Sequence, residues 1–395
     1  MSLELNLRFP EPGSLVIKFD ESESDRLSFE MPLTVRDQED IRWYLEVYSA
    51  QYTADVDDGR ARRIEAKLPQ WGEALFEAAF RSRAAQRYFN DFQDCDERGK
   101  LITISARHPD ILSLPWELLR DPEGTYLVHD NPRISVRRRF AGAGGGRRPF
   151  KFSPKETVRV LFVISRPSDA GFIDPRGEAQ AVMAAIEREA AGRVVVEFLR
   201  PATLTKLVER LEDERLPAVD ILHFDGHGVY DADGRHWEDA KLTGEKVTKE
   251  KRADSATKSA DAADTGYLLF EEDDGTKALV SAETLGDMLN RQKVGLIVLS
   301  ACQSAMVGAT AGSDENSKAS EMGDEAGGEA ERKADADAMG SVAARLTHGG
   351  IPAVLAMTHS VLVTTTQQLF GQFYQNLARG RGWARRWIMR GDICI

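Results

Sequence analysis

From Val158 onwards, short apolar runs alternate with segments whose apolar residues recur at helical spacing. The predicted strands cover 158–164, 193–199, 219–224, 294–299 and 353–357. The predicted helices cover 176–190, 203–211, 282–289, 339–346 and 362–377. Strands that are joined by helices form a parallel sheet with both faces covered, because each right-handed crossover needs a helix. We therefore predict an α/β fold with a mostly parallel sheet flanked by helices, plus a hairpin at 267–280.

Residues 1–140 have a different pattern and predict a smaller α+β region. The alternating runs Leu3–Phe9 and Ser14–Phe19 are typical of a hairpin or of edge strands. Helical periodicity between 35 and 81 predicts two helices. The remaining predicted elements are a strand at 101–105, a helix with Pro115 in its first turn and a strand at 133–137.

Several stretches interrupt these patterns and predict the domain organisation. The glycine-rich run 141–150 is typical of a linker, because glycines lose the most entropy on ordering. The second domain is predicted to cover 151–380, with charged insertions at about 238–264 and 311–337. A basic tail follows at 381–395.

The charge balance and the cysteine content exclude several classes of protein. The 395 residues carry a formal net charge of −12, which argues against nucleic acid as a direct ligand; Arg137, Arg138 and Arg139 are a local exception. No targeting segment or apolar run of about 18 residues is present, so we expect no membrane span and a cytoplasmic location. The three cysteines are too scattered for a disulfide framework or a zinc site.

Two of the predicted strands are followed by residues with reactive side chains. His227 follows the run 219–224, and Cys302 follows the run 294–299. The carboxyl ends of neighbouring parallel strands meet at one edge of a sheet, with the strands about 4.8 Å apart. An imidazole near a thiol can stabilise the thiolate or pass its proton to a leaving amine. We therefore predict a His227/Cys302 dyad; the competing interpretation of Cys302 is a small buried apolar residue.

The residues around this pair suit an acyl-transfer site. Gly226 and Gly228 bracket His227 and predict a tight turn that frees the backbone N–H of Gly228 for an oxyanion, with the N–H of Cys302 as second donor. Asp225 is predicted either to orient the site or to cap that turn. The other residues predicted to line the substrate pocket or support the site are Ser300, Ala301, Gln303 and Ser304.

Two ligand-binding alternatives compete with this interpretation. His223 and His227 have the spacing of metal ligands on a helix, but the strand pattern and the intervening Gly226 disfavour a helix there. His223 is therefore predicted to be a core residue. The run 141–150 lacks the Gly-Lys-Ser/Thr ending of a phosphate-binding loop. We expect neither a metal nor another cofactor.

Together, these motifs resemble the CHAT family of caspase-like (clan CD) cysteine proteases, which are related to caspases and separase. The likeness covers roughly residues 100–380. It is carried by the segments 114–119, 163–167, 172–176, 223–228, 267–271, 300–304, 349–355 and 370–377.

The resemblance implies a caspase-like sheet, His227 and Cys302 as the dyad, and peptide-bond hydrolysis. It implies that residues 1–140 are a non-catalytic, pseudo-caspase-like companion. It also implies a partner protein as substrate, such as a pore-forming or toxic effector in bacterial defence or cell death, and an activating sensor or repeat protein. Ser300 is implied to line the first specificity pocket, where it favours a small or apolar substrate residue. The alternative is a catalytically silent scaffold that acts by binding a partner or effector.

Overall fold

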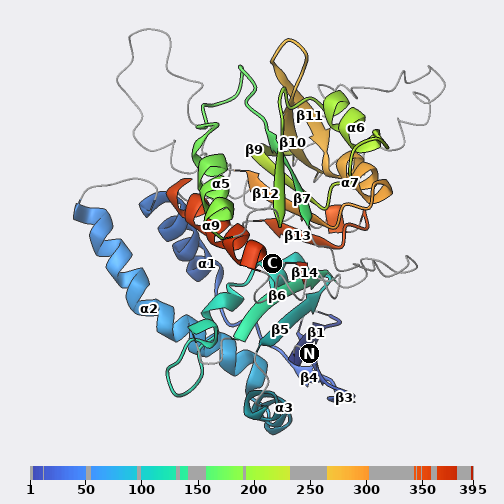
Figure 1. The fold of residues 1–395 in the computed structure, drawn as a ribbon. Helices are drawn as coiled ribbons and strands as arrows, with labels where there is room; N and C mark the ends of the chain where they lie inside the picture. Colours follow the sequence, from blue (N-terminus) through green and yellow to red (C-terminus); the bar gives the residue numbers. More distant parts are fainter. Residues whose placement is uncertain are drawn as a thin grey trace, which may run out of the picture. The chain divides into compact units, whose positions relative to one another are not determined.

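The chain divides into two compact units, unit 1 with residues 1–145 and 392–395 and unit 2 with residues 146–391. The run 141–150 and both charged insertions lie outside the residues that the computed structural model describes, as does the tail 381–395 apart from β14 (Ile393–Cys394). The described residues are 3–11, 13–49, 55–95, 99–129, 134–140, 157–189, 193–231, 265–301, 342–343, 345–347, 349–356, 363–379 and 393–394. Figure 1 shows the two units as ribbons.

Unit 1 is built on a mixed sheet. The strand order is β3 (Ser22–Glu23), β2 (Ser14–Phe19), β1 (Leu3–Phe9), β5 (Lys100–Ala106) and β6 (Ile134–Phe140), with β4 (Leu27–Ser28) paired to β2. The pair β1–β2 is antiparallel, which confirms the predicted hairpin. The pairs β1–β5 and β5–β6 are parallel, so β1 lies inside the sheet.

The helices of unit 1 differ from the prediction at two places. They are α1 (Val35–Arg42), a π-helical turn (Trp43–Tyr48), α2 (Asp55–Phe80), α3 (Arg83–Asp94), α4 (Pro109–Ser113) and 3-10 turns at Trp116–Leu118 and Leu127–His129. No element was predicted for α3, although its buried residues Ala85, Phe89 and Phe92 have helical spacing. The predicted helix at Pro115 is a single 3-10 turn. It ends because the N–H of Arg120 donates to Gly72 of α2 instead of continuing the helix.

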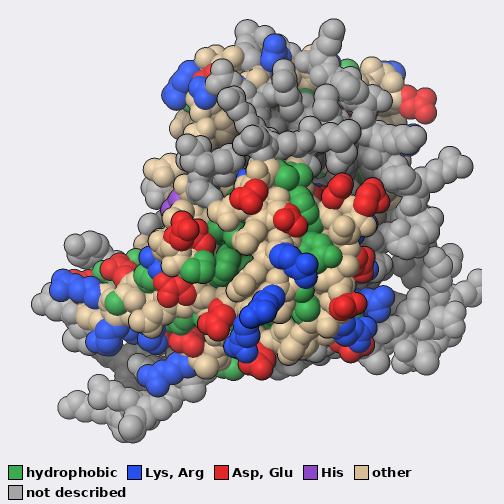
Figure 2. Space-filling view, turned by 90° about the horizontal axis from the view of Figure 1, so that it is seen from below, with side chains coloured by type: hydrophobic (Ala, Val, Ile, Leu, Met, Phe, Trp, Pro, Cys, Tyr) green, Lys and Arg blue, Asp and Glu red, His purple; other side chains and the backbone are tan. Residues whose placement is uncertain are grey.

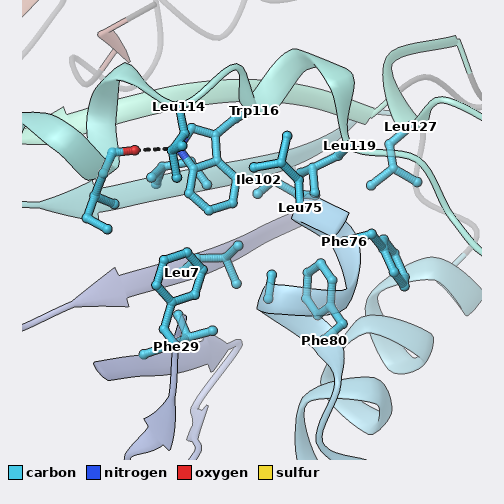
Figure 3. Packing of buried hydrophobic residues seen from close by; sticks show 14 of the residues in the cluster. Leu7, Phe29, Leu75, Phe76, Phe80, Ile102, Leu114, Trp116, Leu119 and Leu127 are labelled. Carbon is cyan, nitrogen blue, oxygen red and sulfur yellow. Dashed lines mark hydrogen bonds between the residues drawn. The ribbon is translucent and has the colours of Figure 1, made fainter. Parts of the chain in front are cut away.

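Aromatic and aliphatic side chains fill the core of unit 1 between its sheet and helices (Figure 3). Trp116 is completely buried there, and its indole N–H donates to the carbonyl of Ile111 at 2.7 Å. Satisfying that donor lets the large ring be buried without an unpaired polar group. The segment 114–119, singled out in the sequence, therefore contributes to the core of unit 1.

The arginines of β6 are paired within unit 1. The buried Arg137 donates to Thr103 and to Glu4, both at 2.8 Å, and Arg139 lies 3.8 Å from the same carboxylate. Burial would raise the pKa of Glu4, but Arg137, Thr103 and Arg139 together lower it. Arg138 pairs with Glu117. On the face in Figure 2, the described basic and acidic side chains are interspersed.

Unit 2 is built on a parallel sheet. The strand order is β8 (Val194–Leu199), β7 (Val158–Ile164), β9 (Ile221–Asp231), β12 (Leu296–Ala301) and β13 (Ala353–Ala356), and each neighbouring pair is parallel. All six residues of β12 are buried, as expected for a strand with both faces covered. The predicted hairpin is β10 (Thr265–Glu271) and β11 (Lys277–Ser281), and β10 pairs antiparallel with the last part of β9.

Helices cover both faces of this sheet (Figure 1). α5 (Gly177–Glu189) and α9 (Val363–Arg379) lie on one face, and α6 (Leu204–Glu212) and α7 (Ala282–Arg291) lie on the other. Ser281 caps α7 as predicted, accepting a hydrogen bond from the N–H of Thr284 at 3.1 Å. Of the predicted helix 339–346, the described residues 342–343 and 345–346 are helical. The predicted α/β fold with a mostly parallel, helix-flanked sheet is confirmed.

Two glycines of α2 allow a matched test of packing in unit 1. A Cβ on Gly72 would overlap the backbone carbonyl of Leu118 and lie 2.8 Å from the Cβ of Arg120, whereas a Cβ on Gly59 would meet only the end of Arg63 at 3.7 Å. We expect Gly72→Ala to lower the free energy of unfolding by about 1–3 kcal/mol through overpacking. Gly59→Ala should raise it by up to about 1 kcal/mol through helix propensity. Urea unfolding of both variants measures this; equal effects would contradict the packing at Gly72.

Candidate functional site

The strand β9 carries the predicted histidine, and it is longer than predicted. It does not end at Phe224 but continues to Asp231, so the tight turn predicted at Gly226–Gly228 is wrong. The reason is β10, which pairs with β9 from His227 to Asp231 and keeps the backbone extended. Asp225 therefore does not cap a turn. Gly226 is required for another reason, since a Cβ there would lie 2.8 Å from the ring of Phe224.

The neighbours of β9 fix the direction of its backbone groups near His227. The carbonyl of Asp225 accepts a hydrogen bond from the N–H of Ser165, which directly follows β7. The backbone groups of Asp225 therefore point to the edge of β9 that faces β7. Successive residues of a strand point to opposite edges, so the N–H of Gly228 points to the edge along which β12 runs. The last described residue of β12, Ala301, pairs with Gly226. The N–H of Gly228 therefore points to the β12 side of β9, at a position just beyond the pair of Gly226 and Ala301.

The side chains of His223, Asp225 and His227 lie on one face of β9, because they are two residues apart. His223 is completely buried and bonds to Glu178 of α5 at 2.6 Å and to the hydroxyl of Tyr374 of α9 at 2.9 Å. It also stacks on Phe162 with ring centroids 4.1 Å apart. These contacts agree with the prediction that His223 is a satisfied core residue.

Glu178 links this histidine to the neighbouring strand. Its second carboxylate oxygen accepts from the hydroxyl of Ser300 on β12 at 2.5 Å, and Ser300 pairs with Asp225 in the sheet. Glu178, Ser300 and Ala301 are all buried. Burial, and then the negative charge of Glu178, raise the pKa of Tyr374 well above its usual value, so its hydroxyl stays protonated. Sequence reasoning missed Glu178, whose position at the start of an amphipathic helix gave no signal of its role.

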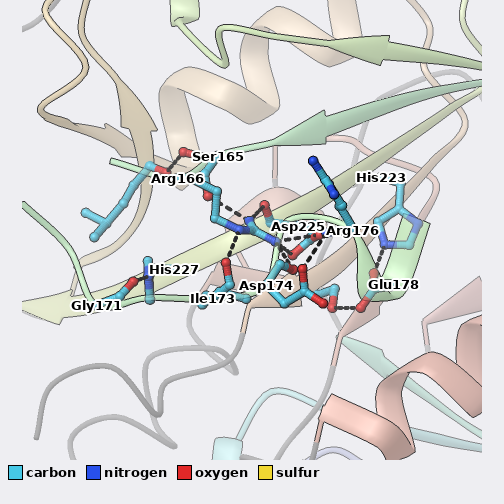
Figure 4. A network of polar contacts seen from close by, with 12 residues as sticks. Ser165, Arg166, Gly171, Ile173, Asp174, Arg176, Glu178, His223, Asp225 and His227 are labelled. Atoms are coloured by element: carbon cyan, nitrogen blue, oxygen red, sulfur yellow. Dashed lines mark hydrogen bonds and ion pairs between the residues drawn. The ribbon is translucent and has the colours of Figure 1, made fainter. Parts of the chain in front are cut away.

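Asp225 is held by an arginine that sequence reasoning did not select. Arg166 donates to the two carboxylate oxygens of Asp225 at 2.7 and 2.8 Å and to its backbone carbonyl at 2.6 Å. The same guanidinium donates to the carbonyls of Ser165, Ile173 and Asp174 at 2.7, 3.0 and 3.2 Å (Figure 4). Its position inside one of the motifs that resemble the family was the available signal. The planar fork of arginine, with its five N–H donors, suits such multiple donation.

We call residues 165–176 the clamp loop, because contacts fix it at several points. Besides the bonds of Arg166, the N–H of Ser168 donates to Gly275 and the N–H of Lys277 donates to the carboxylate of Asp169, both at 2.8 Å. These two bonds attach the loop to the β10–β11 hairpin. The clamp loop is therefore held by both β9 and the hairpin that extends it.

The clamp loop also binds His227. The Nε2 atom of His227 lies 2.8 Å from the carbonyl oxygen of Gly171 (Figure 4). A carbonyl only accepts hydrogen bonds, so Nε2 carries the proton, and in the neutral ring Nδ1 is the basic nitrogen. His227 is 4% exposed. Gly171 could not be found from the sequence, because its contribution is a backbone carbonyl.

The other predicted site residues lie outside the described part of the chain. These are Cys302, Gln303 and Ser304. Within that part, no group of three or more metal-ligating side chains is found, and no helix is long and apolar enough to cross a membrane.

Comparison with known proteins then decides the family. The CHAT domain family model matches residues 70–385, which is most of the chain. The chain belongs to the CHAT domain family. CHAT domains are related to caspase-like clan CD cysteine proteases, so a protease-related function follows at this coarse level. No curated protein sequence matches the chain. The match begins in unit 1, so the CHAT domain extends to both units.

The ionisation of Asp225 predicts a pH dependence of stability. Burial raises its pKa to about 6, and the charge of Glu178 adds to this, while Arg166 opposes it. The folded protein therefore holds this proton more tightly than the unfolded chain does. The stabilisation, about 3 kcal/mol in total, is fully present below about pH 4 and is lost as the pH rises through 6.

We expect this loss in wild type and not in Asp225→Asn, which keeps the shape of the side chain but cannot ionise. Urea unfolding at several pH values between 4 and 6.5 measures the difference between the two proteins. A difference that stays constant across this range would contradict the raised pKa.

Proposed function

We propose that this CHAT protein is a cysteine endopeptidase that uses His227 and Cys302. The observation that carries the proposal is the bond between His227 Nε2 and Gly171, which makes Nδ1 the nitrogen that can take a proton from a thiol. A buried, oriented imidazole next to a reactive thiol is the arrangement that nucleophilic catalysis needs.

The sheet register supports the approach of the two residues. Cys302 follows Ala301 in the chain, and Ala301 pairs with Gly226, which directly precedes His227. Consecutive Cα atoms are about 3.8 Å apart, and paired strands are about 4.8 Å apart. The chain connectivity thus limits the distance between the Cα atoms of His227 and Cys302 to at most two Cα–Cα steps plus one strand spacing. This supports the dyad that the sequence predicts.

The reaction that we propose is hydrolysis of a peptide bond. The Cys302 sulfur attacks the carbonyl carbon, and the imidazole of His227 passes the thiol proton to the leaving amine. The resulting acyl-enzyme thioester is hydrolysed by a water molecule, which regenerates the thiol. The N–H groups of Gly228 and Cys302 are proposed to stabilise the oxyanion, and the direction of the Gly228 N–H in β9 supports the first of these.

The proposed substrate is a partner protein, and the proposed setting is bacterial defence or cell death. A pore-forming or toxic effector would be such a partner, and a sensor or repeat protein would be the activator. We further propose that residues 1–140 form the non-catalytic companion of the catalytic region 151–380. These proposals rest on the family resemblance. The residues proposed to line the substrate pocket or to support the site are Asp225, Ser300, Ala301, Gln303 and Ser304.

Proteolysis can be tested with peptides from a proteome digest and mass spectrometry of the new termini. We expect wild type to produce new termini and both Cys302→Ala and His227→Ala to lose at least about a hundredfold in rate. The half-buried Cys95 lies in unit 1, so Cys95→Ala is the matched control and should retain activity. Identical termini from wild type and Cys302→Ala would contradict the proposal and favour the silent scaffold.

A further inference from the structure

Phe172 is the most exposed large apolar side chain among the described residues. It is 89% exposed, while the next such residue, Val35, is 67% exposed. Burying a phenylalanine ring is worth about 1.5–3 kcal/mol, so an exposed ring forgoes this stabilisation. Single exposed apolar residues are common, and exposure alone assigns no role. The surroundings of Phe172 supply the further observations.

The backbone on both sides of Phe172 is held in place. The preceding residue, Gly171, accepts the hydrogen bond from His227 at 2.8 Å. The two following residues, Ile173 and Asp174, accept from Arg166 at 3.0 and 3.2 Å. The ring therefore projects to solvent from a fixed backbone rather than from an unattached loop end.

The same contacts place Phe172 beside the proposed catalytic histidine. Its Cα is about 3.8 Å from that of Gly171, whose carbonyl touches the imidazole. A substrate whose leaving amine receives a proton from His227 must pass close to this imidazole. A preorganised aromatic surface at that place costs little entropy when it binds, because its backbone is already ordered.

We propose that Phe172 is a specificity-determining residue that contacts an apolar side chain of the substrate within two residues of the scissile bond. The proposal rests on the proposed protease function and adds the class of substrate to it. Contact with an apolar partner removes the exposed ring from water, which a polar substrate residue would not do. The preference of Ser300 for a small or apolar residue concerns another position, on β12, and is a separate expectation.

The test is the cleavage-site profile of five proteins, namely wild type, Cys302→Ala and three further variants, on one proteome-derived peptide library. Phe172→Ser removes the ring, and Phe172→Leu keeps an apolar side chain. Leu216→Ser is the control, because Leu216 is also exposed, at 44%, and lies after α6. We expect wild type, Phe172→Leu and Leu216→Ser to favour an apolar residue at one position near the cleaved bond.

In Phe172→Ser this preference should disappear, and kcat/KM for the best wild-type peptide should fall by about tenfold, mainly through KM. An unchanged profile and an unchanged kcat/KM in Phe172→Ser would overturn the proposal while leaving the proposed protease function intact. If wild type and Cys302→Ala leave the same peptides uncut, the proposed function itself fails, and this proposal with it. Circular dichroism of each variant verifies that the fold is retained.

Discussion

The buried ion pair between Arg166 and Asp225 is the interaction on which the arrangement around His227 depends. Asp225 is 4% exposed, and an ionised carboxylate at such a place is strongly unfavourable unless it is paired and hydrogen-bonded. Arg166 offsets part of this cost with bonds to both carboxylate oxygens. Because the same guanidinium binds the carbonyls of Ile173 and Asp174, neutralising the carboxylate also fixes the clamp loop. That loop supplies the carbonyl that sets the proton position on His227.

A second buried carboxylate, that of Glu178, links the two strands next to which the proposed dyad lies. Glu178 binds His223 on β9 and Ser300 on β12, and His223 in turn binds Tyr374 on α9. Two neighbouring strands and two helices are thus joined by one network of four hydrogen-bonded side chains. Such networks hold strand ends at a defined separation more strictly than apolar packing does. A dyad with His227 on β9 and Cys302 directly after β12 needs such a defined separation.

The elements of unit 2 could be predicted because its strands are continuous apolar runs between helices with clear periodicity. The placement of His227 beside the end of β12 followed from the same pattern. The turn at Gly226 was predicted wrongly, because glycine on both sides of a histidine suggests a turn. Here packing against Phe224 requires the glycine at 226, and pairing of β9 with β10 from His227 onwards keeps the backbone extended. Arg166 and Gly171 act through long-range hydrogen bonds, which no local pattern encodes. Within unit 1, α3 shows that a real periodicity can be overlooked.

The alkylation rate of Cys302 as a function of pH tests the central claim, the pairing of His227 with Cys302, most directly. Iodoacetamide labelling followed by peptide mass spectrometry gives the rate for wild type and for His227→Ala, with labelling of Cys95 as the internal reference. The account predicts that the apparent pKa of the Cys302 thiol lies below the value of about 8.5 for a free thiol in wild type and returns towards it in His227→Ala. Superimposable profiles for the two proteins would contradict it.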